Sequence, residues 1–493
     1  MSISRKLIIL QMIIKNWFVR LGGAVFFIFL ARQLEMDALG LVSLYVLIFN
    51  AGELLVENGV SDALASNRIK TERFCINVAA AIATGVSAIA ATSWWLSSYL
   101  QTSLPGYAVV IFVVYCYLSA YSFAMQGVLR RESRFGVLAK RSAYAVTAAF
   151  VIAVGYFIYN PGADAMLCYF GVSVLTSVGL LLGEHRKLAQ QSKLNADGAH
   201  HEENPGYALK QVGRFFSFKL SSFISGRSLE LFVFIKFGPV GLAALVVGSR
   251  IYNVFGYFIK SVLHDYIFDI NNDRHGTTDA DRHAATQQTV LVATMIAAPV
   301  FLGCAAVAEP LLTLLVGADK AAAADGFLQI FCVLGLVEVI QFILFARILS
   351  STDSLIPVLF QLVRASLLLG VFTFAGTLAL AEYVTLSVML SGAVPVLFIL
   401  FSLVRRRALS RDNLVAFAMY LLAAGLMYAV VTGAERYLSE LNIITGLSAG
   451  YLIALVAGMV LGVFVYPLAN LILNRRDFVA RLRVLLNRKP RPI

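Results

Sequence analysis

The sequence predicts an all-α polytopic membrane protein with about 14 transmembrane helices, and three observations lead to this fold class. The 493 residues are 59% hydrophobic and only 14% charged, which is too apolar for a soluble globular protein. The mean hydropathy of +0.80 places most of the chain in lipid. The apolar residues are also grouped into runs of about 20, the length that an α-helix needs to cross a bilayer.

Fourteen apolar segments follow one another along the chain. Backbone groups inside lipid must be paired within their own segment, which favours helices for all of them. The segments cover residues 8–32, 39–65, 74–98, 106–129, 139–159, 164–183, 209–235, 240–263, 284–307, 323–346, 355–378, 382–403, 413–433 and 443–473. Lys15 and Arg20 interrupt the first segment, so we expect a retained span there and no cleavable signal peptide.

The lysines and arginines predict the orientation of these segments. If the N-terminus is cytoplasmic, 30 of the 40 lie at cytoplasmic ends, including Arg141, Lys260 and the basic tail from residue 475. The opposite ends hold four, which are Arg32, Lys236, Lys320 and Arg436. We therefore expect both termini in the cytoplasm and the tail against anionic lipid headgroups. This bias accounts for most of the net charge of +12, so nucleic acid is not an expected partner.

The cysteines give no sign of a disulfide framework or a metal site. Five cysteines are scattered singly, with no C-x-x-C pair, at Cys75, Cys116, Cys168, Cys304 and Cys332. Isolated cysteines of this kind behave as small apolar residues. We expect no metal and no cofactor.

Three polar residues stand in the middle of the second segment. Asn50, Glu53 and Glu57 are spaced three and four residues apart, which puts them on one face of a helix. A charged side chain at the centre of a bilayer costs about 2.5–3.5 kcal/mol on an insertion scale, so such residues usually have a use. We expect this face to point into the protein or a wet cavity.

The same region carries a resemblance to a known family. The runs FLARQLEMDALGLVSL and ENGVSDALASNR resemble the start of the Wzx-type polysaccharide flippases, within the multidrug/oligosaccharidyl-lipid/polysaccharide exporter superfamily. The matching residues are Ala31, Arg32, Leu34, Gly40, Gly59 and Arg68. Where the family usually has a Gly-Pro pair in the turn, this chain has Glu35 and Met36. Weaker similarity from Met125 to Val146 and from Ala308 to Gly335 extends the resemblance over about residues 10–410.

An internal repeat predicts how the segments are grouped. Residues 218–250 can be laid on residues 15–46, so that Gly226 meets Gly23 and Phe237-Gly238-Pro239 meets Leu34-Glu35-Met36. The resemblance implies two six-helix lobes in a V-shaped arrangement, with two C-terminal helices added. The predicted parts are an N-lobe at 1–184, a cytoplasmic linker at 185–208, a C-lobe at 209–404, the added helices at 405–474 and a basic tail at 475–493.

Several charged and polar residues within the segments are candidates for a substrate site. Arginine stays charged and presents forked donors that match phosphate oxygens. The substrate-binding candidates are Arg20, Lys219, Arg227, Arg250, Asn253, Tyr257 and Arg364. Two simpler explanations remain open: Arg20 and Lys219 could extend to the interface, and Arg227 could neutralise Glu230. Burial favours the protonated form of a carboxyl group, so Glu53, Glu57 and Glu338 are candidates for coupling to an ion.

The predicted function is a secondary transporter. The resemblance implies a flippase in the bacterial inner membrane that moves undecaprenyl-diphosphate-linked oligosaccharide units by alternating access, for exopolysaccharide or O-antigen synthesis. The coupling ion would be a proton or sodium, and a polymerase and chain-length or export proteins would be partners. A peptidoglycan-precursor flippase or a drug/cation antiporter is an alternative from the same superfamily.

A membrane-embedded polymerase or ligase is an alternative of another class. Such an enzyme needs an external catalytic face, whereas the outward connections here are short and nearly free of arginine and histidine. The chain also shows no phosphate loop and no H-E-x-x-H sequence. The sequence therefore favours a protein that is not an enzyme.

Overall fold

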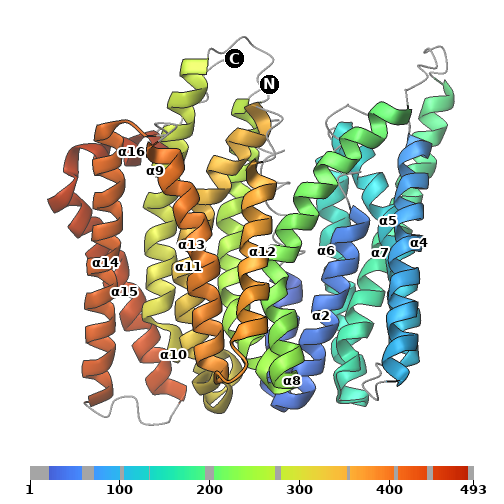
Figure 1. Ribbon diagram of the computed structural model, residues 1–493, viewed down its shortest axis with the longest axis horizontal. Helices are drawn as coiled ribbons and strands as arrows, with labels where there is room; N and C mark the ends of the chain where they lie inside the picture. Colours follow the sequence, from blue (N-terminus) through green and yellow to red (C-terminus); the bar gives the residue numbers. More distant parts are fainter. Residues whose placement is uncertain are drawn as a thin grey trace. The chain divides into compact units, whose positions relative to one another are not determined.

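The structure is a computed structural model, and every element in its described residues is helical (Figure 1). It describes residues 21–57, 61, 72–99, 105–132, 134–194, 205–271, 279–351, 356–404, 409–440 and 448–486. The labelled helices are α2 (Met36–Glu57), α4 (Glu72–Tyr99), α5 (Gly106–Arg131), α6 (Phe135–Tyr159), α7 (Asp164–Leu194), α8 (Pro205–Asn271), α9 (Asp279–Ala306), α10 (Ala308–Val316), α11 (Ala318–Ser351), α12 (Ile356–Phe374), α13 (Leu380–Val404), α14 (Arg411–Glu440), α15 (Ser448–Leu473) and α16 (Arg475–Leu486).

The predicted fold class is confirmed. Within the described residues, 11 helices are long and apolar enough to cross a membrane. Two shorter apolar helices, Leu21–Gln33 and Ile76–Thr92, lie in the first and third predicted segments. The long helix α8 covers two of the predicted segments. With the two shorter helices, each predicted segment therefore contains helix, which agrees with about 14 spans. The chain is a multi-pass membrane protein.

A glycine separates the two halves of α8. Gly238 has φ +68° and ψ −165°, a conformation that strongly favours glycine, and Pro239 follows it. The predicted break between 235 and 240 falls on this kink. The Gly-Pro pair that the repeat places opposite Glu35 and Met36 is thus a real interruption between two helices.

The chain divides into two compact units, each described by itself below. The first comprises Met1–Leu30 and Asp37–Arg227, and the second Ala31–Met36 and Ser228–Ile493. Their boundary lies within α8, whereas the predicted linker was 185–208. Much of that linker is helix, because α7 continues to Leu194 through good helix formers and α8 begins at Pro205, a residue favoured in a first helical turn.

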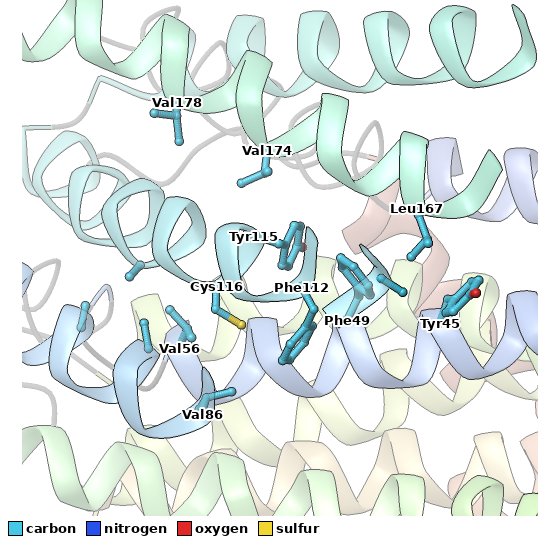
Figure 2. Packing of buried hydrophobic residues seen from close by; sticks show 14 residues of the cluster. Tyr45, Phe49, Val56, Val86, Phe112, Tyr115, Cys116, Leu167, Val174 and Val178 are labelled. Atoms are coloured by element: carbon cyan, nitrogen blue, oxygen red, sulfur yellow. The ribbon is translucent and has the colours of Figure 1, made fainter. Parts of the chain in front are cut away.

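Aromatic side chains form the core of the first unit (Figure 2). Phe49 of α2 stacks on Phe170 of α7 with ring centroids 4.7 Å apart, and it meets Phe112 and Tyr115 of α5 edge-on. Gly52 lies one turn further along α2 and packs directly against the Phe112 ring. A small residue at this point lets the two helices approach closely, as is common in membranes.

The second unit is built around α9, α11, α13 and α14, with α10 and α15 packed alongside. Val307, at φ −109° and ψ 27°, separates α9 from α10. Gly317, at φ +94°, then separates α10 from α11. Gly248 of α8 packs against the backbone of α11, so this contact also depends on a missing side chain.

The start of the predicted basic tail is a helix that packs on the protein. In α16, Phe478 is buried among side chains of α9 and α14. Arg481 donates two hydrogen bonds of 2.6 and 2.8 Å to Asp477 and one of 2.8 Å to Gln288 of α9. Tyr420 of α14 donates to the same Asp477 at 2.8 Å. Residues 475–486 are thus anchored to α9 and α14, while a contact of the tail with lipid headgroups remains a prediction.

In the second unit, backbone carbonyls bind three of the four cations that were predicted to lie on the outward side. Lys236 donates to the carbonyl of Ala375, just beyond α12, and also lies over the Tyr383 ring. Lys320 donates to the carbonyl of Ala31, and Arg32 makes a long contact of 3.5 Å with the carbonyl of Leu314. Cations near helix C-termini are favourable, so these residues have local structural reasons for their positions.

Candidate functional site

A cluster of charged side chains joins α8, α11 and α12 in the second unit. Glu338 of α11 is at its centre, and its Oε1 forms an ion pair of 2.8 Å with Nη1 of Arg364 on α12. Its Oε2 accepts hydrogen bonds of 3.0 Å from Lys260 Nζ and 2.5 Å from the Tyr252 hydroxyl, both on α8. We call these four residues the Glu338 cluster. Two cations and one anion leave it with a net charge of +1.

The Glu338 cluster is buried but not sealed. The side chains of Arg364, Glu338 and Lys260 are 9%, 15% and 28% exposed, so access increases from the arginine towards the lysine. The Nε of Arg364 is buried and has no hydrogen-bond partner within the described residues. The guanidinium therefore has a donor to spare beside the one that Glu338 occupies.

Aromatic and small residues hold this cluster in place. The Tyr252 ring stacks on Phe331 of α11 with centroids 5.7 Å apart and lies near Phe301 of α9. Gly335, three residues before Glu338, packs directly against the Tyr252 ring. The close approach of α8 and α11 brings the hydroxyl within reach of the carboxylate. The absence of a side chain at Gly335 thus leaves room for the Tyr252 ring and positions its hydroxyl.

A second polar cluster lies in the first unit and has another composition. Arg141 of α6 is buried, and it donates to the hydroxyls of Ser122 on α5 at 3.0 Å and Ser142 at 3.4 Å. Gln126 donates to the same Ser122 at 3.4 Å. We call these four residues the Arg141 cluster. Apart from the guanidinium group of Arg141, the hydrogen-bonding groups of this cluster are neutral hydroxyl and amide groups.

Glu53 of α2 lies near the Arg141 cluster. It accepts a hydrogen bond of 3.3 Å from the hydroxyl of Tyr115, which Figure 2 shows among the aromatic side chains of the core. Arg141 also interacts with Glu53 electrostatically. The first unit therefore contains a half-buried acid and a buried base that are near each other.

The structure places the predicted site residues unequally. Glu338 and Arg364 are brought together in the Glu338 cluster, and Glu53 lies beside the Arg141 cluster. The other predicted residues with described side chains, all partly buried, are Glu57 on α2 and Arg227, Arg250 and Asn253 on α8. Lys219 and Tyr257 lie on α8 with side chains outside the described part, and Arg20 lies outside the described residues.

Sequence reasoning missed two members of these clusters, Lys260 and Arg141. Both were counted as cations at cytoplasmic ends, whereas both are buried or half-buried within the protein. A signal was present for Lys260, because it lies seven residues after Asn253 and three after Tyr257 and so continues their helical face.

A similar signal was present for the Arg141 cluster. Ser119, Ser122 and Gln126 are spaced three and four residues apart on an apolar helix, and all three are buried. One polar stripe on such a helix indicates a polar partner on a neighbouring helix. Arg141 is that partner.

Chemically, the Glu338 cluster suits binding of an anion with several oxygens. Arginine and lysine together bind phosphate groups well, and a tyrosine hydroxyl can add a donor. Within the described residues, no group of three or more histidine, cysteine or acidic side chains could hold a metal ion.

Comparison with known families identifies the chain. Residues 29–324 match the family model described as polysaccharide biosynthesis protein. The chain belongs to this family. The matched residues include α2, the whole Arg141 cluster, and Lys260 and Tyr252 of the Glu338 cluster. The predicted family resemblance is therefore confirmed.

Solved structures show the same fold. A structure described as lipid II flippase MurJ in an inward closed conformation matches with a TM-score of 0.68 and 14% identity, over 94% of this chain and 99% of that one. A mutant of the Vibrio cholerae MATE transporter VcmN matches with a TM-score of 0.54 and 15% identity, over 81% and 97%. An inward-facing MATE family transporter of the MOP superfamily gives 0.57 and 13%, over 80% and 94%. No curated protein sequence matches the chain significantly.

Proposed function

We propose that this membrane protein of the polysaccharide biosynthesis family is a flippase for undecaprenyl-diphosphate-linked oligosaccharides. It would move the repeat unit from the cytoplasmic to the periplasmic leaflet of the bacterial inner membrane, by alternating access and with both termini in the cytoplasm. The observation that carries the proposal is the Glu338 cluster, a partly accessible and net positive group within the membrane spans. A lipid diphosphate needs such a group because its charge must be compensated on the way through a low-dielectric region.

The family and fold support movement of a lipid-linked sugar without its chemical alteration. The matched family is described by polysaccharide biosynthesis, and one solved structure with this fold is described as a lipid II flippase. Both point to a substrate in which a glycan is attached to a lipid. Multidrug transporters share this fold, so the fold alone does not determine the substrate. The residues of the site must determine it.

The proposed coupling uses an ion gradient, with a proton or sodium as the ion. The acidic candidates for carrying this ion are Glu53, Glu57 and Glu338, and the Tyr115 hydroxyl donates a hydrogen bond to Glu53. Glu338 already contacts two cations and is less suited to carrying a further one. A polysaccharide polymerase and chain-length or export proteins would act on the delivered units.

The proposal can be tested by finding which leaflet holds the lipid-linked repeat unit in a deletion strain. Repeat units would be radiolabelled, and a glycosidase restricted to the periplasm would report those in the outer leaflet. We expect intact units to accumulate out of reach of the glycosidase, and the wild-type gene to restore access. The variant Arg364→Ala should fail to restore it, whereas Arg436→Lys, on an exposed outward residue, should succeed.

Other outcomes would separate the alternatives. Repeat units that reach the glycosidase normally but stay unpolymerised would overturn the flippase and favour a polymerase or ligase. Peptidoglycan precursors that accumulate in place of repeat units would indicate a peptidoglycan-precursor flippase. Normal leaflet distributions of both lipids, with increased drug sensitivity, would indicate a drug/cation antiporter.

A further inference from the structure

We propose that Glu338 is an internal counter-anion, which occupies the anion-binding donors of the second unit until a diphosphate displaces it. This inference rests on the proposed function, since it gives the diphosphate group its binding site. It begins from the way in which three donors on two helices converge on one carboxylate. Arg364, Lys260 and the Tyr252 hydroxyl approach it within 2.8, 3.0 and 2.5 Å.

The donors match a larger anion than the one they hold. A carboxylate has two oxygens, and both oxygens of Glu338 are occupied. Nε of Arg364 still has no partner among the described residues, although the side chain is nine-tenths buried. A diphosphate has more oxygens than a carboxylate, so it could accept from Lys260, Tyr252 and both Nη1 and Nε of Arg364.

The charge of the cluster points the same way. Two cations against one anion leave a surplus positive charge in a membrane span, where an unbalanced charge is unfavourable. A buried ion pair that served helix packing alone would need one cation, and such pairs add little to stability over apolar residues. A surplus cation is expected where a second anion has to bind.

Accessibility gives the order of events. Lys260 is the most exposed member, Glu338 is intermediate and Arg364 is the least exposed. An incoming diphosphate would therefore meet Lys260 first and reach Arg364 as Glu338 moves away. The return of Glu338 would favour release, because its carboxylate again contacts both cations as the anion departs. A transport site has to release its cargo as well as bind it, and a built-in competitor serves this need.

Binding of undecaprenyl diphosphate to the purified protein tests this inference. Wild type and Glu338→Gln would be placed in lipid nanodiscs and titrated with undecaprenyl diphosphate at several salt concentrations. Glutamine keeps the shape of the side chain and removes its charge. We expect Glu338→Gln to bind about tenfold more tightly, a difference that is well resolved in Kd. Glu309→Gln, the same change at an exposed position of α10 in this unit, should bind as the wild type does.

A second variant tests whether the surplus positive charge accounts for the tighter binding. Glu338→Gln combined with Lys260→Gln restores the cluster to one surplus positive charge. The double variant should therefore return towards the wild-type affinity. Equal or weaker binding by Glu338→Gln, together with no difference between the single and double variants, would overturn the inference and leave Glu338 as a residue that holds Arg364 in place.

The inference and the proposed function can fail separately. If neither wild type nor Glu338→Gln binds undecaprenyl diphosphate, the counter-anion is wrong, whereas the flippase still depends on the leaflet assay. If Glu338→Gln binds more tightly but the deletion strain exposes its repeat units normally, the anion exchange stands and the flippase is wrong. Tighter binding with slower restoration of repeat-unit access would support both.

Discussion

The two units hold a buried arginine in two different ways. In the first, Ser122 and Ser142 accept hydrogen bonds from Arg141 at 3.0 and 3.4 Å. In the second, the carboxylate of Glu338 forms an ion pair of 2.8 Å with Arg364. Hydroxyl groups solvate a cation without cancelling its charge, whereas a carboxylate cancels it. The comparison indicates that Arg141 keeps its positive field inside the protein, and that Arg364 is neutralised until another anion replaces Glu338.

The internal repeat shows a second difference in charge between the two units. When Gly226 is matched with Gly23, the same spacing matches Asn253 with Asn50 and Lys260 with Glu57. The polar amide is kept, and an acid in the first copy becomes a base in the second. One helical face therefore carries opposite charge in the two units, which is the pattern expected if the first serves a cation and the second an anion.

Removal of Arg364 should have the largest effect on stability. Breaking a buried ion pair by deleting one partner costs about 3–5 kcal/mol, and Lys260 still faces Glu338, so we expect about 3 kcal/mol for Arg364→Ala. Arg364→Lys keeps the charge and should lose much less. Denaturant unfolding in detergent would measure both. An alanine variant as stable as the wild type would contradict the role of this pair.

Removal of Arg141 should cost less, because its hydrogen-bonding partners are neutral. A hydrogen bond to a charged group contributes about 1.5–3 kcal/mol, and the variant also avoids the burial of a charge, so we expect about 1.5 kcal/mol for Arg141→Ala. The same unfolding measurement compares it with Arg364→Ala. The contrast between the units would be wrong if Arg141→Ala were the more damaging change.

A methyl group at Gly335 or at Gly52 should destabilise the two units similarly. A Cβ at Gly335 would lie 2.5 Å from the Tyr252 ring, and one at Gly52 would lie 2.6 Å from the Phe112 ring. Overpacking of this kind costs about 1–3 kcal/mol. Gly370→Ala is the matched control, because no heavy atom lies within 4 Å of its added Cβ. Thermal unfolding would distinguish them, and equal midpoints for Gly335→Ala and Gly370→Ala would argue against the close packing of α8 and α11.

Loss of a tyrosine hydroxyl should also separate the two units. The hydroxyl of Tyr252 lies 2.5 Å from Glu338 and that of Tyr115 lies 3.3 Å from Glu53. We expect Tyr115→Phe to cost about 0.5–1.5 kcal/mol, and Tyr252→Phe to cost more, about 1.5–3 kcal/mol. Unfolding free energies of the two variants give the comparison directly. The reverse order would mean that the short contact is not a strong hydrogen bond.

The fold class could be predicted because the apolar segments and their length are local properties of the sequence. Even the break at Gly238 was visible as a Gly-Pro pair. The helix α16 was not predicted, because its positive charge suggested a tail that lies against lipid headgroups. The buried Arg481 is paired with Asp477 four residues earlier, and its contacts with α9 and α14 depend on tertiary structure.

The site was predictable only in part, for a physical reason. Glu338 and Arg364 were conspicuous as charges in the middle of predicted spans. Arg141 and Lys260 were hidden, because a cation near the end of an apolar segment satisfies the positive-inside rule whether or not it turns into the protein. The burial of such a residue depends on the neighbouring helices, and the polar spacing on those helices was the one available sign.

Flipping by the purified protein tests the central claim most directly. The protein would be reconstituted into vesicles that carry the undecaprenyl-diphosphate-linked oligosaccharide in both leaflets, and a glycosidase that cannot cross the bilayer would be added outside. We predict that wild-type protein exposes the inner-leaflet fraction to the enzyme, and that Arg364→Ala leaves it as protected as in protein-free vesicles. Continued protection with folded wild-type protein under an imposed proton or sodium gradient would contradict the claim.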